Sequence, residues 1–256
     1  MNRHEGKTGE QHSDITQCFH PEVRIDGFTK LDGTIRFYSF VKAIMLRDSS
    51  RTVLDFGAGR GAFWLDSSSE YRRFMQDLRF QDVHVTACDV DDAVKTHPCS
   101  QQQIVITIGQ PLPFEDNQFD LIVSDFVFEH IADPSFVAAE LLRILKPGGY
   151  VCARTANRFG YVKFMAQLIP NSLHVAFLRR IQPDREAEDV FPTVYKLNSA
   201  SQVKDHFRNC DVYSYFDSAE PAYHFGNKLL YWLFSFWHKI MPDVLATSVC
   251  FFIRKH

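Results

Sequence analysis

Apolar positions along the chain switch repeatedly between two spacings, which predicts strands and helices in turn. Short apolar or β-branched runs predict strands over residues 52–56, 83–89, 103–108, 119–124 and 150–155. Apolar residues three and four positions apart predict helices over 32–48, 71–78 and 134–145, and serines at 67–69 interrupt the helical region before the second of these. This alternation predicts a doubly wound α/β fold, with a parallel sheet and helices on both faces.

The second half of the chain departs from this rhythm before the fold closes. A helix over 161–169, three prolines and mixed charges predict a cap inserted at about 157–205. A helix over 199–207, a strand over 211–217, an aromatic helix over 223–240 and a last strand over 246–254 follow. We expect one domain over residues 18–256, preceded by a flexible polar tail over 1–17.

The first strand runs into a glycine turn, and this stretch carries the first sign of function. Asp55 is followed by Gly57, Gly59 and Gly61. Glycine allows positive φ and lets a ligand approach the main chain closely, which favours a nucleoside-bearing cofactor. An ordinary glycine-rich turn without a ligand is the alternative, because a single glycine signature is weak evidence.

A second acid, Asp89, ends the second predicted strand. Open α/β sheets bind ligands outside the carboxyl ends of their strands, where Asp55 and Asp89 are both expected. A carboxylate there can accept hydrogen bonds from two ribose hydroxyls. The neighbouring Asp91 and Asp92 are expected to be solvated or to cap a helix.

A dinucleotide enzyme must be weighed, because Gly57, Gly59 and Ala62 also fit the fingerprint of NAD-binding turns. Three features argue against it. An acid stands two residues before the first glycine, Asp89 follows Asp55 by 34 residues rather than by the shorter NAD spacing, and the later motifs are of another kind.

Composition narrows the class of protein further. The net charge of -3 gives no field that favours nucleic acid, and no nucleic-acid partner is expected. The six cysteines form no CxxC pair and are expected to be reduced residues of a cytoplasmic protein, without a metal or a disulfide. The polar N-terminus lacks the apolar core of a signal peptide.

Five motifs in order carry a family resemblance: residues 55–61, Asp89, and the segments 112–120, 129–134 and 142–149. Together they resemble class I S-adenosylmethionine-dependent methyltransferases, in particular the methyltransferase type 11 group. The resemblance implies a Rossmann-like, mostly parallel seven-stranded sheet with an antiparallel last strand. It also implies methyl transfer from S-adenosyl-L-methionine to an oxygen or nitrogen of a small-molecule, glycan or lipid-linked acceptor. A protein that binds this cofactor without catalysis is the alternative.

The resemblance also assigns residues to the cofactor. The glycine turn would lie against the methionine part, with Asp55 holding its amino group, while Asp89 would bind the ribose and Val90 would pack on the adenine. The segment before residue 112 lacks the family's usual acid, so Gln110 or backbone groups must recognise the adenine. The full set of implied cofactor residues is Asp55, Gly57, Ala58, Gly59, Gly61, Asp89, Val90, Gly109, Gln110, Ser124, Asp125 and Phe126.

His130 is the candidate general base, since it follows the fourth strand and histidine is the side chain most often used as a base. A structural histidine in the same loop is the alternative. Tyr195 in the cap is a second candidate catalytic residue, and Arg154, Asn157 and Asp189 could also face the acceptor.

The aromatic helix over 223–240 is apolar on nearly all sides. Phe225, Leu229, Trp232 and Phe236 recur at steps typical of one helix face. Such a helix is either deeply buried or exposes a patch to a lipid surface, a partner or an apolar substrate. The stretch is too short to span a bilayer, but peripheral contact with the inner face of a membrane is compatible with it.

Overall fold

A computed structural model describes residues 14–80, 82–160, 193–221 and 227–256 of the chain. Its centre is a seven-stranded sheet with the order β3-β2-β1-β4-β5-β7-β6. Strands β1 to β5 pair in parallel, and β7 lies antiparallel between β5 and β6. The predicted doubly wound sheet with an antiparallel last strand is thus confirmed. The strands are β1 (Thr52–Phe56), β2 (His84–Asp89), β3 (Gln102–Val105), β4 (Phe119–Asp125), β5 (Leu145–Ala156), β6 (Cys210–Asp217) and β7 (Ser248–Lys255).

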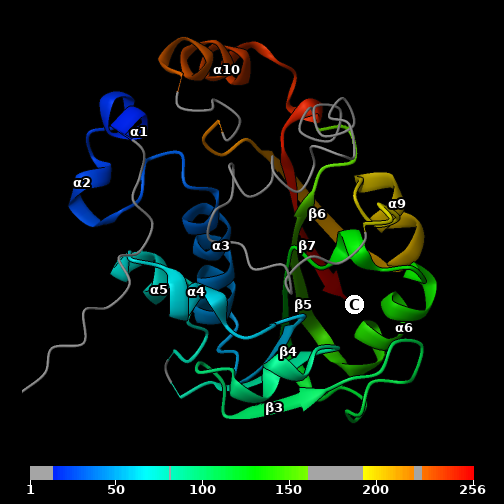
Figure 1. Ribbon diagram of the computed structural model, residues 1–256. Coiled ribbons are helices and arrows are strands. Elements are labelled where there is room, and N and C mark those ends of the chain that lie inside the picture. The colour runs from blue at the N-terminus through cyan, green and yellow to red at the C-terminus, as the bar shows by residue number, and fades with distance from the viewer. Residues whose placement is uncertain (1–13, 81, 161–192, 222–226) are drawn as a thin grey trace, which may run out of the picture.

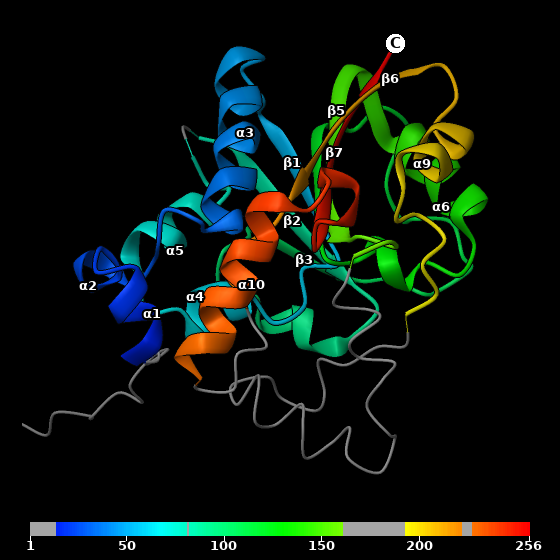
Figure 2. The same ribbon diagram turned by 90° about the horizontal axis from the view of Figure 1, so that it is seen from above.

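Helices cover both faces of this sheet, with α3, α4 and α5 on one side and α6 and α9 on the other (Figures 1 and 2). The α-helices are α1 (Asp14–Phe19), α2 (Val23–Asp26), α3 (Gly33–Arg47), α4 (Ala62–Asp66), α5 (Glu70–Gln76), α6 (Pro134–Ile144), α9 (Ala200–His206) and α10 (Lys228–Ile240). Short 3₁₀ turns form η1 (Asp92–Thr96), η2 (Phe128–His130) and η4 (Asp243–Leu245).

Two apolar cores follow from the alternation of side chains along the strands. Val53 of β1 and Leu121 of β4 pack with α3 in one core, where Phe37 is fully buried. Their neighbours in sequence, Leu54 and Ile122, belong to the other core, which includes α6 and α9. A strand buried on both faces reads as a continuous apolar run, which is why these strands could be predicted.

Side-chain caps set where the flanking helices begin. Asp32 accepts a hydrogen bond from the Ile35 amide at the start of α3 (3.0 Å), and Asp133 accepts one from the Phe136 amide at the start of α6 (3.1 Å). Ser69 caps α5 through the Arg72 amide (3.0 Å). The predicted restart of the helix after the serine run is therefore confirmed.

Several boundaries differ from the predicted ones. β3 ends at Val105 rather than at 108: the Ile106 amide makes a last bond to the Asp89 carbonyl (2.8 Å), and the chain then turns. β5 begins at Leu145, since this residue pairs with Phe119 before a shift in register. Residues 14–17 were expected in the loose tail, but they begin α1.

Other predicted segments fall outside the described residues. These are the tail over 1–13, most of the cap including the helix over 161–169 and Asp189, and Phe225 before the aromatic helix. The cap and the extent of the single domain stay predictions.

Candidate active site

The glycine turn after β1 is closed on one side and open on the other. The amides of Gly57 and Ala58 both donate to the Cys88 carbonyl of β2 (2.8 and 3.1 Å). Gly57 has φ of +79°, and a Cβ there would collide with Val127. At Gly59, with φ of +53°, a Cβ would meet nothing within 4 Å. The turn therefore leaves its Gly59 side accessible to a ligand.

Asp89 lies beside this open side with its carboxylate fixed by two amides. One oxygen accepts from the Gly59 amide (2.8 Å) and the other from the Asp91 amide (3.0 Å). A carboxylate has about four lone-pair sites, so each oxygen keeps one for a ligand hydroxyl. Asp91 caps η1 through the Ala93 amide (2.8 Å), and Asp92 is exposed.

Three acids converge from neighbouring strands: Asp55 from β1, Asp89 from β2 and Asp125 from β4. Burial raises the pKa of Asp55 to about 7, and repulsion from Asp125 and Asp89 adds to this. Within the described part of the chain, Asp55 accepts no hydrogen bond. A buried acid with no cation bound to it, next to a turn open at Gly59, fits a ligand that carries a positive charge.

His97 belongs to this site, although the sequence reasoning did not single it out. Its Nδ1 accepts from the Cys99 amide (3.3 Å), so the ring proton sits on Nε2. The Nε2 is buried without a hydrogen-bond partner among the described residues, and it lies 3.9 Å from Asp55 Oδ2. Burial lowers the pKa of His97 to about 4, so the ring is neutral near pH 7.

The predicted cofactor residues at the end of β4 have different environments. Asp125 is held by Arg154 through two bonds of 2.7 Å, so its carboxylate is largely engaged. Ser124 is fully buried, and its hydroxyl has no hydrogen-bond partner in the described ranges. Phe126 has φ of +57° and is partly exposed, with the Arg154 guanidinium 4.8 Å from its ring centre.

The predicted adenine side is exposed. Val90 is partly exposed at the end of β2. Gly109 and Gln110 lie on the turn after β3, where the Gln110 amide donates to the Thr107 carbonyl (3.2 Å). The bond from the Ile106 amide to the Asp89 carbonyl places the start of this turn beside the end of β2. Contacts of Gly109 and Gln110 with a ligand stay a prediction.

The two candidate catalytic residues are brought together by Glu129. The amides of Val194 and Tyr195 both donate to the Glu129 carbonyl (2.7 and 3.2 Å), so the segment with Tyr195 lies against the 3₁₀ turn that ends at His130. The Glu129 side chain is buried and accepts from the Thr155 hydroxyl (2.7 Å). Burial raises the pKa of Glu129, and its position inside the fold is that of a structural acid.

Two residues that were considered for the acceptor side have structural roles. Arg154 is buried on β5, where it pairs with Asp125 and donates to the Thr34 hydroxyl (3.0 Å). Asn157 is buried and donates to the carbonyls of Val244 and Ala246 (2.8 Å each). Their polar groups are used inside the fold and are not available to a substrate.

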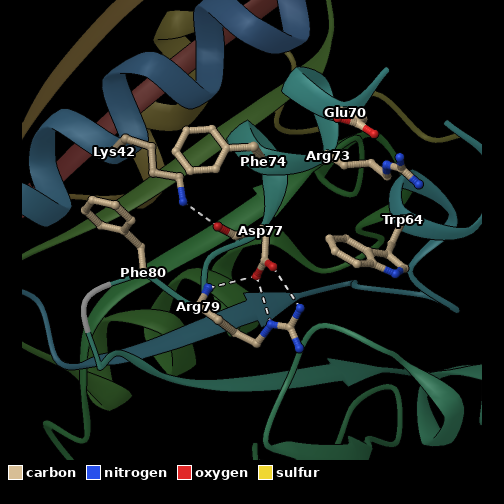
Figure 3. A pocket seen from close by; sticks show the side chains of 8 residues that line it. All are labelled: Lys42, Trp64, Glu70, Arg73, Phe74, Asp77, Arg79 and Phe80. Atoms are coloured by element: carbon tan, nitrogen blue, oxygen red, sulfur yellow. Dashed lines mark hydrogen bonds and ion pairs between the residues drawn. The ribbon is translucent and has the colours of Figure 1, made fainter. Parts of the chain in front are cut away.

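A separate cavity of about 370 Å³ lies behind α4, between α5 and α3 (Figure 3). Lys42 reaches into it, donates to the Asp77 carbonyl and lies 5.0 Å from the ring centre of Phe80. Arg79 pairs with Asp77 (2.8 Å) and donates to the Pro98 carbonyl (3.0 Å). A Cβ on Gly61 would lie 2.7 Å from Pro98. Because Arg79 binds Pro98, this network packs against the glycine turn at Gly61.

Comparisons with known proteins agree with this geometry. A family model described as "Methyltransferase domain" matches residues 54–153. The mitochondrial ubiquinone biosynthesis O-methyltransferase of Candida albicans is 33% identical over 120 residues, which is 44% of this chain and 35% of that protein. The demethylmenaquinone methyltransferase of Staphylococcus carnosus is 29% identical over 143 residues, 52% of this chain and 58% of that protein. The chain thus spans less than two thirds of each relative.

Two solved structures share the fold. The [4+2]-cyclase SpnF has a TM-score of 0.50 at 14% identity, over 86% of this chain and 81% of that chain. The plantazolicin methyltransferase BpumL, in complex with a monoazolic desmethylPZN analog and SAH, has a TM-score of 0.50 at 11% identity, over 95% and 88%. The motifs and the family match coincide on the same residues, so residues 54–153 of this chain are similar to a methyltransferase domain, and they contain most of β1 and the whole of β2, β3 and β4 of the sheet.

Proposed function

We propose that the protein transfers the methyl group of S-adenosylmethionine to an oxygen or nitrogen atom of a small-molecule, glycan or lipid-linked acceptor. One observation supports this most: a turn open at Gly59 stands between the fixed carboxylate of Asp89 and the largely buried carboxyl of Asp55, which accepts no hydrogen bond from a described residue. The methyltransferase match covers the glycine turn itself, which favours this function over an NAD-linked oxidoreductase. When bound, S-adenosylmethionine would supply a methyl group on a sulfonium sulfur, which leaves as a neutral thioether when the methyl group is transferred.

Each proposed contact matches the chemistry of one part of the cofactor. Asp89 accepts from the two ribose hydroxyls with the lone pairs that its amide contacts leave free. Asp55 holds the cationic amino group, and the His97 Nε2 lies 3.9 Å from its carboxyl. Gly59 allows close approach of the ligand, and Phe126 offers an apolar ring at the end of β4.

For the acceptor, the protein has to align a nucleophile and remove its proton when the atom is a hydroxyl oxygen or an ammonium nitrogen. His130 is the proposed base, and Tyr195 is the proposed partner that orients the acceptor, because both flank Glu129. The Candida albicans relative is named an O-methyltransferase, which supports an oxygen acceptor. We place this reaction in the cytoplasm, at the inner face of a membrane.

The direct test is transfer of a tritium-labelled methyl group from S-adenosylmethionine to fractions of a cell extract, separated into soluble metabolites, glycans and lipids. We expect label in one fraction with the wild-type protein and little with His130→Ala. If S-adenosylhomocysteine binds tightly but no fraction takes up label, the protein is a non-catalytic binding protein and the proposal is wrong.

A further inference from the structure

Helix α10 directs its most apolar side away from the protein. Each of six large side chains has another of the set three or four residues away, so they share one face of the helix. They are between 43% and 64% exposed. We call this face the α10 stripe, and it consists of Leu229, Trp232, Leu233, Phe236, Trp237 and Ile240.

The opposite side of α10 attaches the helix to the protein. Tyr231 is buried there, stacks on Phe19 of α1 with ring centres 4.8 Å apart, and meets His20 edge to face. Asn227 caps the helix by accepting from the amides of Leu229 and Leu230 (2.9 and 3.2 Å). Tyr231 thus packs α10 against the protein, while the α10 stripe faces outward, unlike the usual amphipathic helix of a soluble protein.

The stripe lies at the same end of the sheet as the cofactor site. Ser248, the first residue of β7, pairs with Ala156, the last residue of β5. Asn157 then ties the link after α10 to this point through the carbonyls of Val244 and Ala246. Since β1, β2, β4 and β5 are parallel, their carboxyl ends share this edge, and α10 stands beyond it next to α1 (Figures 1 and 2).

The charged residues of α10 favour an anionic lipid surface over other partners that could cover the α10 stripe. The helix has no acidic residue over 228–240, and its lysines stand at its two ends, Lys228 and Lys239. Both are exposed, and neither forms an ion pair with another described residue. A face of Trp, Phe and Leu with lysines at its ends is typical of helices that lie in the interface of anionic membranes.

Length and shape agree with such a position. The 13 residues of α10 extend over about 20 Å, whereas the hydrocarbon core of a bilayer is about 30 Å thick. None of the helices in the described ranges is long and apolar enough to cross a membrane. A single helix that projects outward presents a convex surface. Fluid lipid can pack around such a surface more easily than a flat protein surface can.

We propose that α10 lies parallel to the plane of an anionic membrane, with the α10 stripe inserted among the lipids. This position holds the carboxyl edge of the sheet at the lipid surface, where a lipid-linked acceptor can reach the cofactor site. The proposal rests on the proposed methyl transfer only for the nature of the acceptor, because membrane binding is measured without turnover.

The test is co-sedimentation of the full chain with phosphatidylcholine vesicles that contain or lack phosphatidylglycerol. We expect binding to the anionic vesicles, and a loss of at least about tenfold in partition coefficient for a Trp232→Ser and Phe236→Ser double variant, since two inserted aromatic side chains are removed. Tyr213→Ser on β6, which removes a similarly exposed ring from outside the stripe, is the matched control and should bind like the wild type.

A Lys228→Glu and Lys239→Glu variant should lose the preference for phosphatidylglycerol. All variants should still bind S-adenosylhomocysteine, which shows that they fold. Equal sedimentation of the stripe variant and the wild type would overturn the proposal, as would a wild-type dimer in solution that the stripe variant lacks. Methyl transfer to a water-soluble acceptor without vesicle binding would refute the membrane contact alone, and vesicle binding without any transfer would refute the proposed function alone.

Discussion

Asp55 should make the affinity for S-adenosylhomocysteine depend on pH. Its pKa is raised to about 7, mainly by burial and further by Asp125 and Asp89. The ammonium group of the ligand favours the ionised carboxylate, so binding below pH 7 must release a proton. Affinity then falls about tenfold for each pH unit below 7, which amounts to a loss of about 30-fold between pH 8 and pH 5.5. His97, whose pKa is about 4, stays neutral over this range.

The raised pKa of Asp55 also determines whether the ligand-free protein becomes more or less stable as pH rises. Folded Asp55 keeps its proton up to about pH 7, whereas the unfolded chain releases it near the ordinary value of 3.8. Because the native state binds more protons between these values, the free energy of unfolding should fall as pH rises from about 4 to about 7.

Isothermal titration calorimetry of S-adenosylhomocysteine from pH 5.5 to pH 8 measures the effect on binding. Buffers of different ionisation enthalpy report the proton released. The isosteric control Asp55→Asn cannot ionise, so it should bind more weakly than wild type at pH 8 and show almost no dependence on pH. A flat profile for the wild type, or the same slope in Asp55→Asn, would refute the assignment of Asp55 to the amino group.

Four further variants test other parts of the site. Gly57→Ala forces a Cβ into a positive-φ position that also collides with a neighbour, and should lower the free energy of unfolding in urea by about 2–5 kcal/mol. Gly59→Ala, at positive φ but with open space, should cost only about 1–2 kcal/mol, and equal losses would contradict the packing argument. Arg154→Met leaves the partly buried Asp125 without its ion-pair partner and should cost up to about 3 kcal/mol, visible as a lower Tm; an unchanged Tm would mean that the ion pair adds no stability. His130→Ala should keep its affinity for S-adenosylhomocysteine and slow turnover about a hundredfold or more, so normal turnover would make His130 structural.

The sheet and the glycine turn could be predicted because their signals are local. Buried strands are continuous apolar runs, and a turn that needs positive φ at residues 57, 59 and 61 needs glycine there. Asp89 could be predicted for the same reason, since it ends such a run. The position of both acids at one edge then follows from parallel pairing alone.

Other features depend on contacts between distant segments and could not be read from the sequence. His97 joins the site only because the chain after η1 returns beneath Gly61. Arg154 faces Asp125 through the register of β4 and β5, which pairs these residues directly. The spacing of apolar residues in α10 predicts an apolar face. Which side of the helix faces the protein is determined by the stacking of Tyr231 on Phe19, which the sequence does not show.

The most direct test of the central claim is calorimetric titration of wild type and Asp89→Ala with S-adenosylhomocysteine, with NAD as the control ligand. Wild type should bind S-adenosylhomocysteine at one site and not bind NAD. Asp89→Ala should weaken binding by about a hundredfold or more, because two charge-assisted hydrogen bonds to the ribose are lost. Equally tight binding by Asp89→Ala, or binding of NAD by the wild type, would contradict the placement of the methyl donor at the glycine turn.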